Sequence, residues 1–197
     1  MKKLTFIVLL FTGLMASAQL AQGNSLISAG VGLGIYQGSG AKMKVPPVSL
    51  TYEYMVTDNI SAGLEAGYYK FGYDFGVNMT SNVDGESSSA SIGSSGEYDV
   101  FYVVGVGNYH FVNNYNLDIY GGIKLGYASV SGESSTTATD SEGNTVNMSA
   151  NTGPRSGLAF GAQVGGRYMF SDSFGAFAEL GYGTSIIKLG VTLKLGY

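Results

Sequence analysis

The chain has 197 residues, of which 31 are Gly, 15 are Tyr and 10 are Phe, and only 12% are charged. Gly destabilises helix interiors while Tyr and Phe favour half-buried strands, so this composition disfavours a helical protein and favours an all-β one. A formal net charge of -4 with 45% hydrophobic residues argues against a disordered chain and a nucleic-acid partner, and the lack of Cys excludes disulfides, thiolate metal sites and a lipoprotein anchor.

The N-terminus has the three parts of a secretory signal peptide. Lys2 and Lys3 form the positive start, an apolar stretch follows, and Ala16-Ser17-Ala18 matches the cleavage pattern. The apolar stretch is shorter than the roughly 20 residues that a membrane-spanning helix needs. We therefore expect residues 1–18 to be a cleaved signal peptide and residues 19–197 to form one domain.

The remaining chain alternates apolar residues with polar residues or Gly in eight stretches. A period of two indicates strands that present one apolar and one polar face. The predicted strands are residues 27–36, 48–55, 60–69, 98–111, 117–128, 158–170, 174–182 and 187–197.

The connections between these strands alternate in length. Short turns are expected at residues 57–59, 113–114 and 171–173. Long, polar connections are expected near residues 37–47, 74–97 and 131–155, whereas the last one, near 183–185, is short. Short turns at one rim and long loops at the other are typical of transmembrane barrels. The sequence therefore predicts an all-β, eight-stranded antiparallel up-and-down transmembrane β-barrel.

A repeat at hairpin scale accompanies this pattern. Tyr54–Ile60 matches Tyr168–Phe174, and each copy continues to a carboxylate-x-Gly-Tyr sequence that ends at Tyr68 or Tyr182. Lys124-Leu125-Gly126-Tyr127 is a third copy with the charge reversed. The Tyr residues of the copies lie on the apolar face, where they predict an aromatic girdle at a membrane interface.

Together, the signal peptide, the amphipathic strands, the alternating connections and the aromatic C-terminal strand resemble the small outer-membrane β-barrel proteins of the OmpA/OmpX type. The resemblance implies a place in the cell outer membrane, contact with its lipid, and assembly by the barrel-assembly machinery. In that family the last strand resembles the signal that the machinery reads, here carried by Leu193, Leu195 and Tyr197. The short fourth outer connection departs from the family, and we expect no peptidoglycan-binding tail.

Eight charged residues lie on the polar face of the predicted strands, which faces the barrel interior. Side chains fill the lumen of an eight-stranded barrel, and an unpaired charge there costs several kcal/mol. Four acidic and four basic groups balance, so we expect a structural salt-bridge network rather than a catalytic carboxylate pair. Its members are Glu53, Glu65, Asp118, Lys124, Arg167, Glu179, Lys188 and Lys194. Within it, Glu179 is the expected partner of Arg167.

His110 is the only histidine. Alignment with the repeat places it in the lumen near the short turns, whereas the parity of Tyr102, Val104 and Val106 places it outside. A bulge near Gly107 would reconcile the two. Lipid A deacylases resemble this architecture but use a membrane-facing His and Ser, and the sequence offers no Ser in phase next to His110.

The expected function is that of a non-enzymatic surface barrel without cofactors or metals. Its three long loops would serve adhesion, defence or envelope integrity through an extracellular ligand. A narrow channel for a small solute or a hydrophobic ligand is the alternative, although the lumenal charges would block it. A lipid-modifying barrel enzyme is a third hypothesis.

Overall fold

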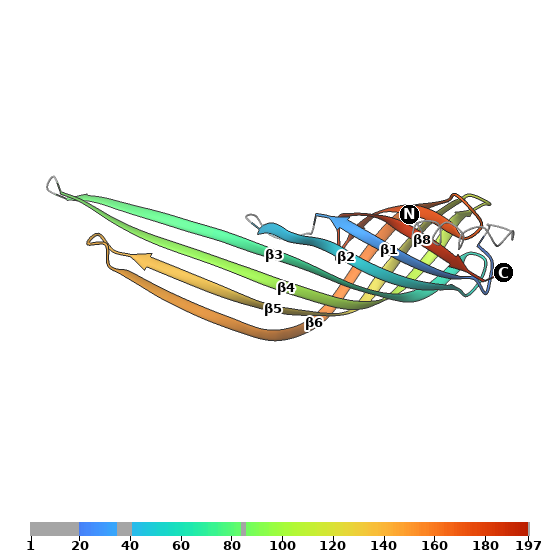
Figure 1. The fold of residues 1–197 in the computed structure, drawn as a ribbon, viewed down its shortest axis with the longest axis horizontal. Helices are drawn as coiled ribbons and strands as arrows, with labels where there is room; N and C mark the ends of the chain where they lie inside the picture. The colour runs from blue at the N-terminus through green and yellow to red at the C-terminus, as the bar shows by residue number, and fades with distance from the viewer. Residues whose placement is uncertain (1–19, 35–40, 84–85, 197) are drawn as a thin grey trace, which may run out of the picture.

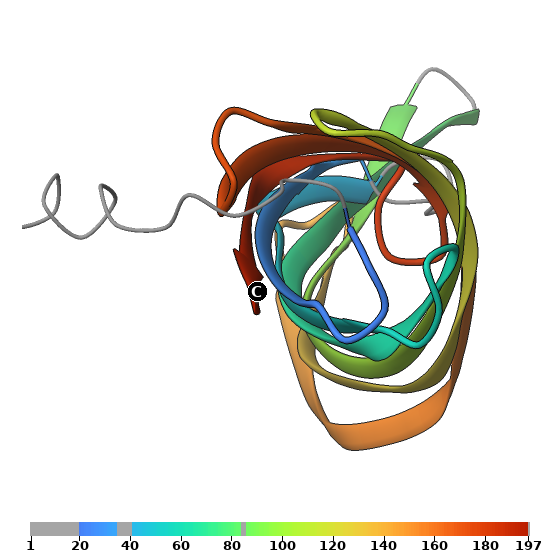
Figure 2. The same cartoon turned by 90° about the vertical axis from the view of Figure 1, so that its right-hand side faces the viewer.

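The computed structural model describes residues 20–34, 41–83 and 86–196, so the expected signal peptide and Tyr197 lie outside the described residues. The chain forms an antiparallel sheet of eight strands in sequence order, closed into a barrel where β1 pairs with β8 (Figures 1 and 2). This confirms the predicted fold class. The strands are β1 Ser25–Leu33, β2 Ala41–Met55, β3 Ile60–Val83, β4 Glu86–Asn113, β5 Leu117–Thr139, β6 Thr145–Met169, β7 Phe174–Tyr182 and β8 Ile187–Leu195.

The strands differ greatly in length. β1, β7 and β8 have 9 residues each, whereas β3 to β6 have between 23 and 28. The wall of the barrel is therefore low on one side, and on the other side it continues as a four-stranded sheet (Figure 1). We call this extension, residues 74–95 and 135–149, the ribbon. Among the described residues, no helix is long and apolar enough to cross a membrane.

Two of the expected long loops are strands, which corrects the sequence analysis. Residues 74–97 and 131–155 fall mostly within β3, β4, β5 and β6, and their backbones pair from Lys70↔Asp99 up to Val83↔Glu86 and from Gly132↔Thr152 up to Thr139↔Thr145. In these segments apolar residues still alternate with polar ones, but they are few. The many Ser and Thr residues between them make the alternation hard to recognise in the sequence. Part of the third loop, residues 41–47, belongs to β2, where the register shifts between Met43 and Val48.

The turn at the tip of the β5–β6 hairpin is held by one carboxylate. Asp140 Oδ1 accepts hydrogen bonds from the backbone N–H groups of Asn144 (2.8 Å) and Glu142 (3.0 Å), and Oδ2 accepts one from Asn144 Nδ2 (2.9 Å). The Asn144 side chain and backbone hold the pKa of Asp140 below its ordinary value. Gly143 supplies the positive φ of 84° that the turn requires. A hydrogen-bonded turn therefore ends the β5–β6 hairpin.

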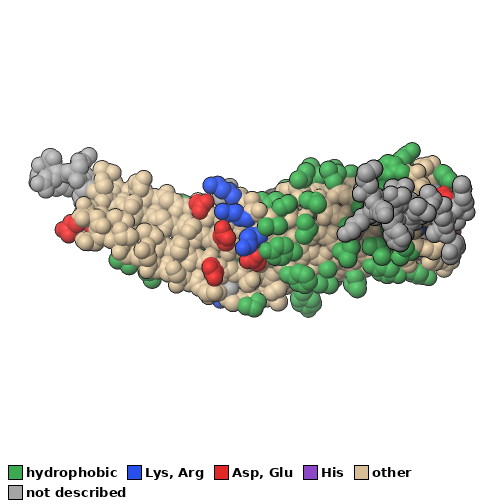
Figure 3. All heavy atoms as spheres, viewed as in Figure 1, with side chains coloured by type: hydrophobic (Ala, Val, Ile, Leu, Met, Phe, Trp, Pro, Cys, Tyr) green, Lys and Arg blue, Asp and Glu red, His purple; other side chains and the backbone are tan. Residues whose placement is uncertain are grey.

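The polarity of the two sheet faces reverses along the strands. In the barrel, most inward side chains are polar or charged and outward ones are apolar, which gives the apolar belt of Figure 3. In the ribbon, alternation places Ser and Asn on the outward face and an apolar row on the inward face. That row consists of Phe75, Val77, Met79, Ile92, Val146 and Met148, all of them exposed.

The N-terminal segment closes the barrel at the end that carries the short turns. Leu20 is buried against Leu26 and Met55. Asn113 fixes it there, since its side chain accepts from the Leu20 N–H (3.2 Å) and donates to the Leu20 carbonyl (2.6 Å). The Gly23 N–H donates to the Met55 carbonyl (2.9 Å). This apolar floor lies directly below the charged interior.

We expect the barrel to fold without the β3–β4 half of the ribbon, because the ring closes below it. Replacing residues 76–93 with a two-residue turn joins Phe75 to its register partner Ser94. A folded barrel resists SDS until it is boiled, so the shortened protein should keep a heat-dependent shift in gel mobility. Loss of the shift, while a Gly143→Ala variant in the other hairpin keeps it, would show that barrel closure depends on the β3–β4 half of the ribbon.

Candidate functional site

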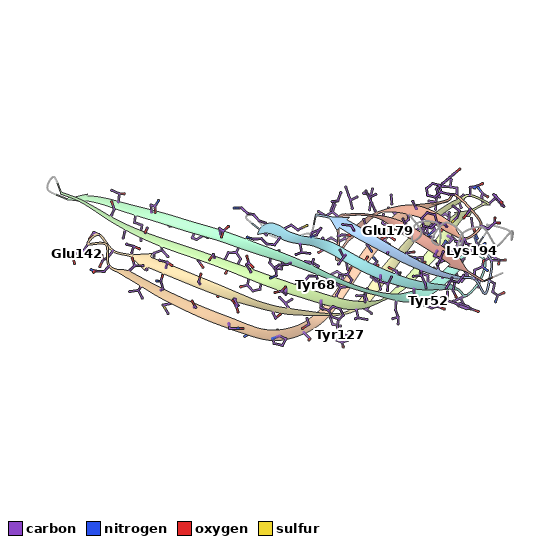
Figure 4. All side chains as sticks on the ribbon, in the orientation of Figure 1. Tyr52, Tyr68, Tyr127, Glu142, Glu179 and Lys194 are labelled. Atoms are coloured by element: carbon purple, nitrogen blue, oxygen red, sulfur yellow. The ribbon has the colours of Figure 1, made fainter. Side chains whose placement is uncertain are left out.

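The candidate site is the charged interior of the barrel. All eight charged residues singled out in the sequence are buried there, although they come from six different strands. They are Glu53, Glu65, Asp118, Lys124, Arg167, Glu179, Lys188 and Lys194. Figure 4 shows Glu179 and Lys194 in the barrel half of the molecule, far from Glu142 at the tip of the ribbon.

Four of these residues form what we call the mid-barrel cluster: Glu65, Lys124, Glu179 and Lys188. Glu65 Oε2 lies 2.7 Å from Lys124 Nζ and 2.8 Å from Lys188 Nζ. Glu179 Oε2 lies 3.3 Å from Lys188 Nζ and 3.9 Å from Lys124 Nζ. Two carboxylates and two ammonium groups therefore alternate around a ring, and their charges cancel.

A second group near the short turns, which we call the rim cluster, is centred on Arg167. Its Nη1 donates to Asp118 Oδ2 (2.8 Å) and its Nη2 donates to Glu53 Oε1 (3.1 Å). Asn108 and Ser61 donate to the other oxygen of Glu53, at 2.9 and 3.0 Å. Arg is suited to this position because its planar fork serves two carboxylates at once.

Tyr120 lies between the two clusters. Its hydroxyl donates to Glu179 Oε1 (2.8 Å) in the mid-barrel cluster, while its ring faces Arg167, whose Cζ is 4.9 Å from the ring centroid. Tyr102 donates in the same way to Glu65 Oε1 (2.9 Å). Tyr120 therefore joins the two clusters, through a hydrogen bond on one side and a cation–π contact on the other, into a network that runs from the rim to the middle of the barrel.

The expected pairing of Arg167 with Glu179 is wrong. In the β6–β7 ladder Arg167 lies opposite Phe177, and Glu179 lies opposite Gly165, two residues further along. On its other side, β6 places Arg167 opposite Asp118 of β5. Arg167 therefore bonds to Asp118 within the sheet and to Glu53 across the lumen, and Glu179 is bound by the two lysines.

His110 lies in the interior, with 0% of its surface exposed. Of the two orientations left open by the sequence, the lumenal one is correct, and the residues that suggested the other, Tyr102, Val104 and Val106, face inward as well. No bulge is found at Gly107, where the register is continuous. The shift comes after His110, between it and Val112.

His110 also has a Ser in phase, contrary to the sequence analysis. Its Nε2 lies 3.0 Å from Ser61 Oγ on the adjacent β3, and its Nδ1 lies 2.6 Å from Asp118 Oδ1. This is the order of contacts in a Ser–His–Asp triad. Ser61 is only 1% exposed, however, and Glu53 competes for its hydroxyl proton. The three residues therefore fill and bridge the rim cluster, and the Ser61 hydroxyl is enclosed by it.

The other predicted residues lie near the short turns. Lys194 is buried on β8, where its backbone N–H donates to the Ser173 carbonyl (2.7 Å) and its charge interacts with Asp172. Leu193 and Leu195 face outward on the same strand, opposite Ile27 and Ser25 of β1. Tyr197, the last member of the expected assembly signal, lies outside the described residues.

Several network members were missed by the sequence analysis because they carry no charge: Ser61, Asn108, Tyr102, Tyr120 and Thr51. The alternation along each strand was the available signal, because it places each of these residues on the same face of the sheet as a lumenal charge on its own or the neighbouring strand. Among the described residues, no three His, Cys, Asp or Glu side chains are grouped to hold a metal ion. The geometry supports pairing of opposite charges within the lumen.

Comparison with known proteins returned structures only. The N-terminal β-barrel domain of Pseudomonas aeruginosa OprF aligns with 89% of this chain and 100% of its own, at 18% sequence identity and a TM-score of 0.47. Ail, the attachment invasion locus protein of Yersinia pestis, aligns with 88% of this chain and 95% of its own, at 14% identity and a TM-score of 0.39. No protein-family model and no curated protein matches the chain.

The rim cluster predicts a large effect of one substitution. Arg167→Met leaves two buried carboxylates without their cation, and the free energy of unfolding should fall by about 3–5 kcal/mol. Arg155→Met, at an exposed position of β6, should change it by less than about 0.5 kcal/mol. Urea unfolding of the protein reconstituted in vesicles measures both.

A double-mutant cycle identifies the partner of Arg167. Arg167→Met should couple strongly to Asp118→Asn and to Glu53→Gln, because each pair shares a hydrogen bond, and weakly to Glu179→Gln. Stronger coupling to Glu179 than to either of the other carboxylates would contradict the assigned pairing.

Proposed function

We propose that the protein is a non-enzymatic outer-membrane barrel, exported through the cleavable signal of residues 1–18, whose closed lumen anchors a surface-exposed ribbon. The ribbon then acts in adhesion, defence or envelope integrity by contacting an extracellular ligand. The observation that carries the proposal is the reversal of face polarity where the barrel becomes the ribbon. An outward face that changes from apolar to polar has left the lipid.

The apolar belt has boundaries typical of a bilayer. Tyr residues on the outer face lie toward both ends of the belt. Tyr52, which is exposed, lies nearer the short turns, and half-buried Tyr68 and exposed Tyr127 lie where the strands leave the barrel (Figure 4). Tyr is favoured at membrane interfaces because its ring is apolar and its hydroxyl is polar. The belt between these residues supports contact with outer-membrane lipid, and the terminal strand with Leu193 and Leu195 supports recognition by the barrel-assembly machinery.

A row of ion pairs marks the outer boundary of the belt (Figure 3). Its pairs are Lys42–Asp74 (3.4 Å), Lys44–Glu97 (3.4 Å) and Lys70–Asp99 (3.5 Å). All six residues face outward, and charged side chains at this height would be costly in hydrocarbon. The row therefore supports a position at the level of the lipid head groups, with the ribbon beyond it in water.

The interior supports a role without catalysis or conduction. The rim and mid-barrel clusters occupy the lumen with side chains that bind one another, and the triad-like Ser61, His110 and Asp118 are buried among them. A catalytic serine needs a free approach for its substrate, which burial of Ser61 prevents. The ribbon is then the part of the molecule that is built to meet other molecules.

Cysteine labelling tests the location and the orientation, because the natural chain contains no Cys. Glu142→Cys at the ribbon tip should react with a membrane-impermeant maleimide on intact cells. Asp172→Cys at a short turn is the matched control, and it should react only after the outer membrane is permeabilised. Labelling of Asp172→Cys but not Glu142→Cys on intact cells would reverse the orientation, and recovery of the protein in a soluble fraction would contradict the location.

A further inference from the structure

The barrel also contains a mostly apolar cavity of about 240 Å³ above the mid-barrel cluster, with Thr184 and Lys124 as polar members of its lining. Its inward lining comes from the long strands β3 to β6 and includes Tyr69, Val104, Ala128 and Ala159. Its floor is Lys124, whose ammonium group is bound to Glu65 (2.7 Å). An apolar space over a closed ionic floor cannot pass its contents down the barrel axis, because the charges below are paired and packed.

The cavity opens sideways between β6 and β7. The paired register of these strands stops at Ala162↔Tyr182. The chain turns away at Gly183, where φ is +108° and a Cβ atom would lie 2.4 Å from the Phe160 carbonyl oxygen. β6 continues for many residues beyond this point, so the low wall leaves a notch beside Leu158 and Phe160.

The residues that border this notch belong both to the cavity lining and to the apolar belt. Leu158, Phe160 and Tyr182 line the cavity and are also among the exposed residues of the apolar belt. The rings of Phe160 and Tyr182 lie 6.1 Å apart across the notch. The lining of the cavity is therefore continuous with the face that contacts lipid, at the end of the belt near the ribbon.

We propose that the cavity takes up one acyl chain of an outer-leaflet lipid, which enters through the β6–β7 notch. This inference rests on the proposed membrane location. The occupant follows from the lining, because an apolar chain loses nothing by leaving the bilayer for a mostly apolar cavity. Its presence also spares the half-buried Tyr69, Ala128 and Ala159 contact with water. A lipid keeps its head group at the level of the Lys70–Asp99 pair while its chain bends into the barrel.

Photo-crosslinking tests the proposal. The protein is reconstituted in phosphatidylcholine vesicles that contain a phosphatidylcholine with a diazirine at the end of one acyl chain, and crosslinks are located by mass spectrometry. Lumenal lining residues such as Tyr69 should be crosslinked together with belt residues such as Leu64. Ala159→Phe, which fills the cavity, should lower the lumenal crosslinks about tenfold. Ala62→Phe, the same change on the outward face of β3, should leave them unchanged.

The outcomes separate this inference from the proposed membrane location. Belt crosslinks without lumenal ones, or lumenal crosslinks that persist in Ala159→Phe, would overturn the acyl-chain site alone. Loss of both kinds of crosslink would contradict membrane insertion as well. Heat-dependent gel mobility establishes that each variant is folded, and Ala128→Leu fills the same cavity if Ala159→Phe does not fold.

Discussion

The structure depends on one electrostatic constraint: each charge enclosed by eight strands must be bound by a group of opposite charge. The ring is too narrow for bulk water, so each buried carboxylate or ammonium group needs a partner inside the protein. The mid-barrel cluster meets this need with two charges of each sign around a ring. The rim cluster meets it with the fork of Arg167, which binds Asp118 within the sheet and Glu53 across the lumen.

The network is spread over strands that are distant in sequence, and this spread links it to barrel closure. Lys188 of β8 reaches Glu65 of β3, and Arg167 of β6 reaches Glu53 of β2. These contacts exist only when the ring is closed, whereas β-ladder bonds between neighbours can form in an open sheet. The ion pairs thereby favour one register of the whole barrel, since a slip of one residue would turn the charges toward the apolar face.

A second consequence concerns the long strands. The same four strands serve two environments, with a polar interior and apolar exterior in the barrel and the opposite arrangement in the ribbon. The row of ion pairs from Lys42–Asp74 to Lys70–Asp99 lies where the reversal occurs. The cavity lies next to the level of these ion pairs, on the side of the barrel. At this height the inward face of the long strands is apolar, and the short strand β7 no longer continues the wall. The unequal strand lengths thus produce both the ribbon and the lateral notch.

Much of this could be predicted from the sequence, because alternation depends only on neighbours along the chain. It identified the eight strands and placed Glu65, Lys124 and Arg167 inside the barrel. It failed where the answer depends on the closed ring. Arg167 was assigned to the wrong carboxylate because contacts across the lumen depend on register and diameter. Ser-rich composition hid the ribbon, and the inward apolar residues Tyr102 and Val104 gave an ambiguous parity.

Electrical recording tests the central claim, that paired charges close the lumen, most directly. In a planar bilayer, the wild-type protein should show no stable conductance, because the rim and mid-barrel clusters fill the path. Stable channels of porin size would contradict a lumen closed by paired charges.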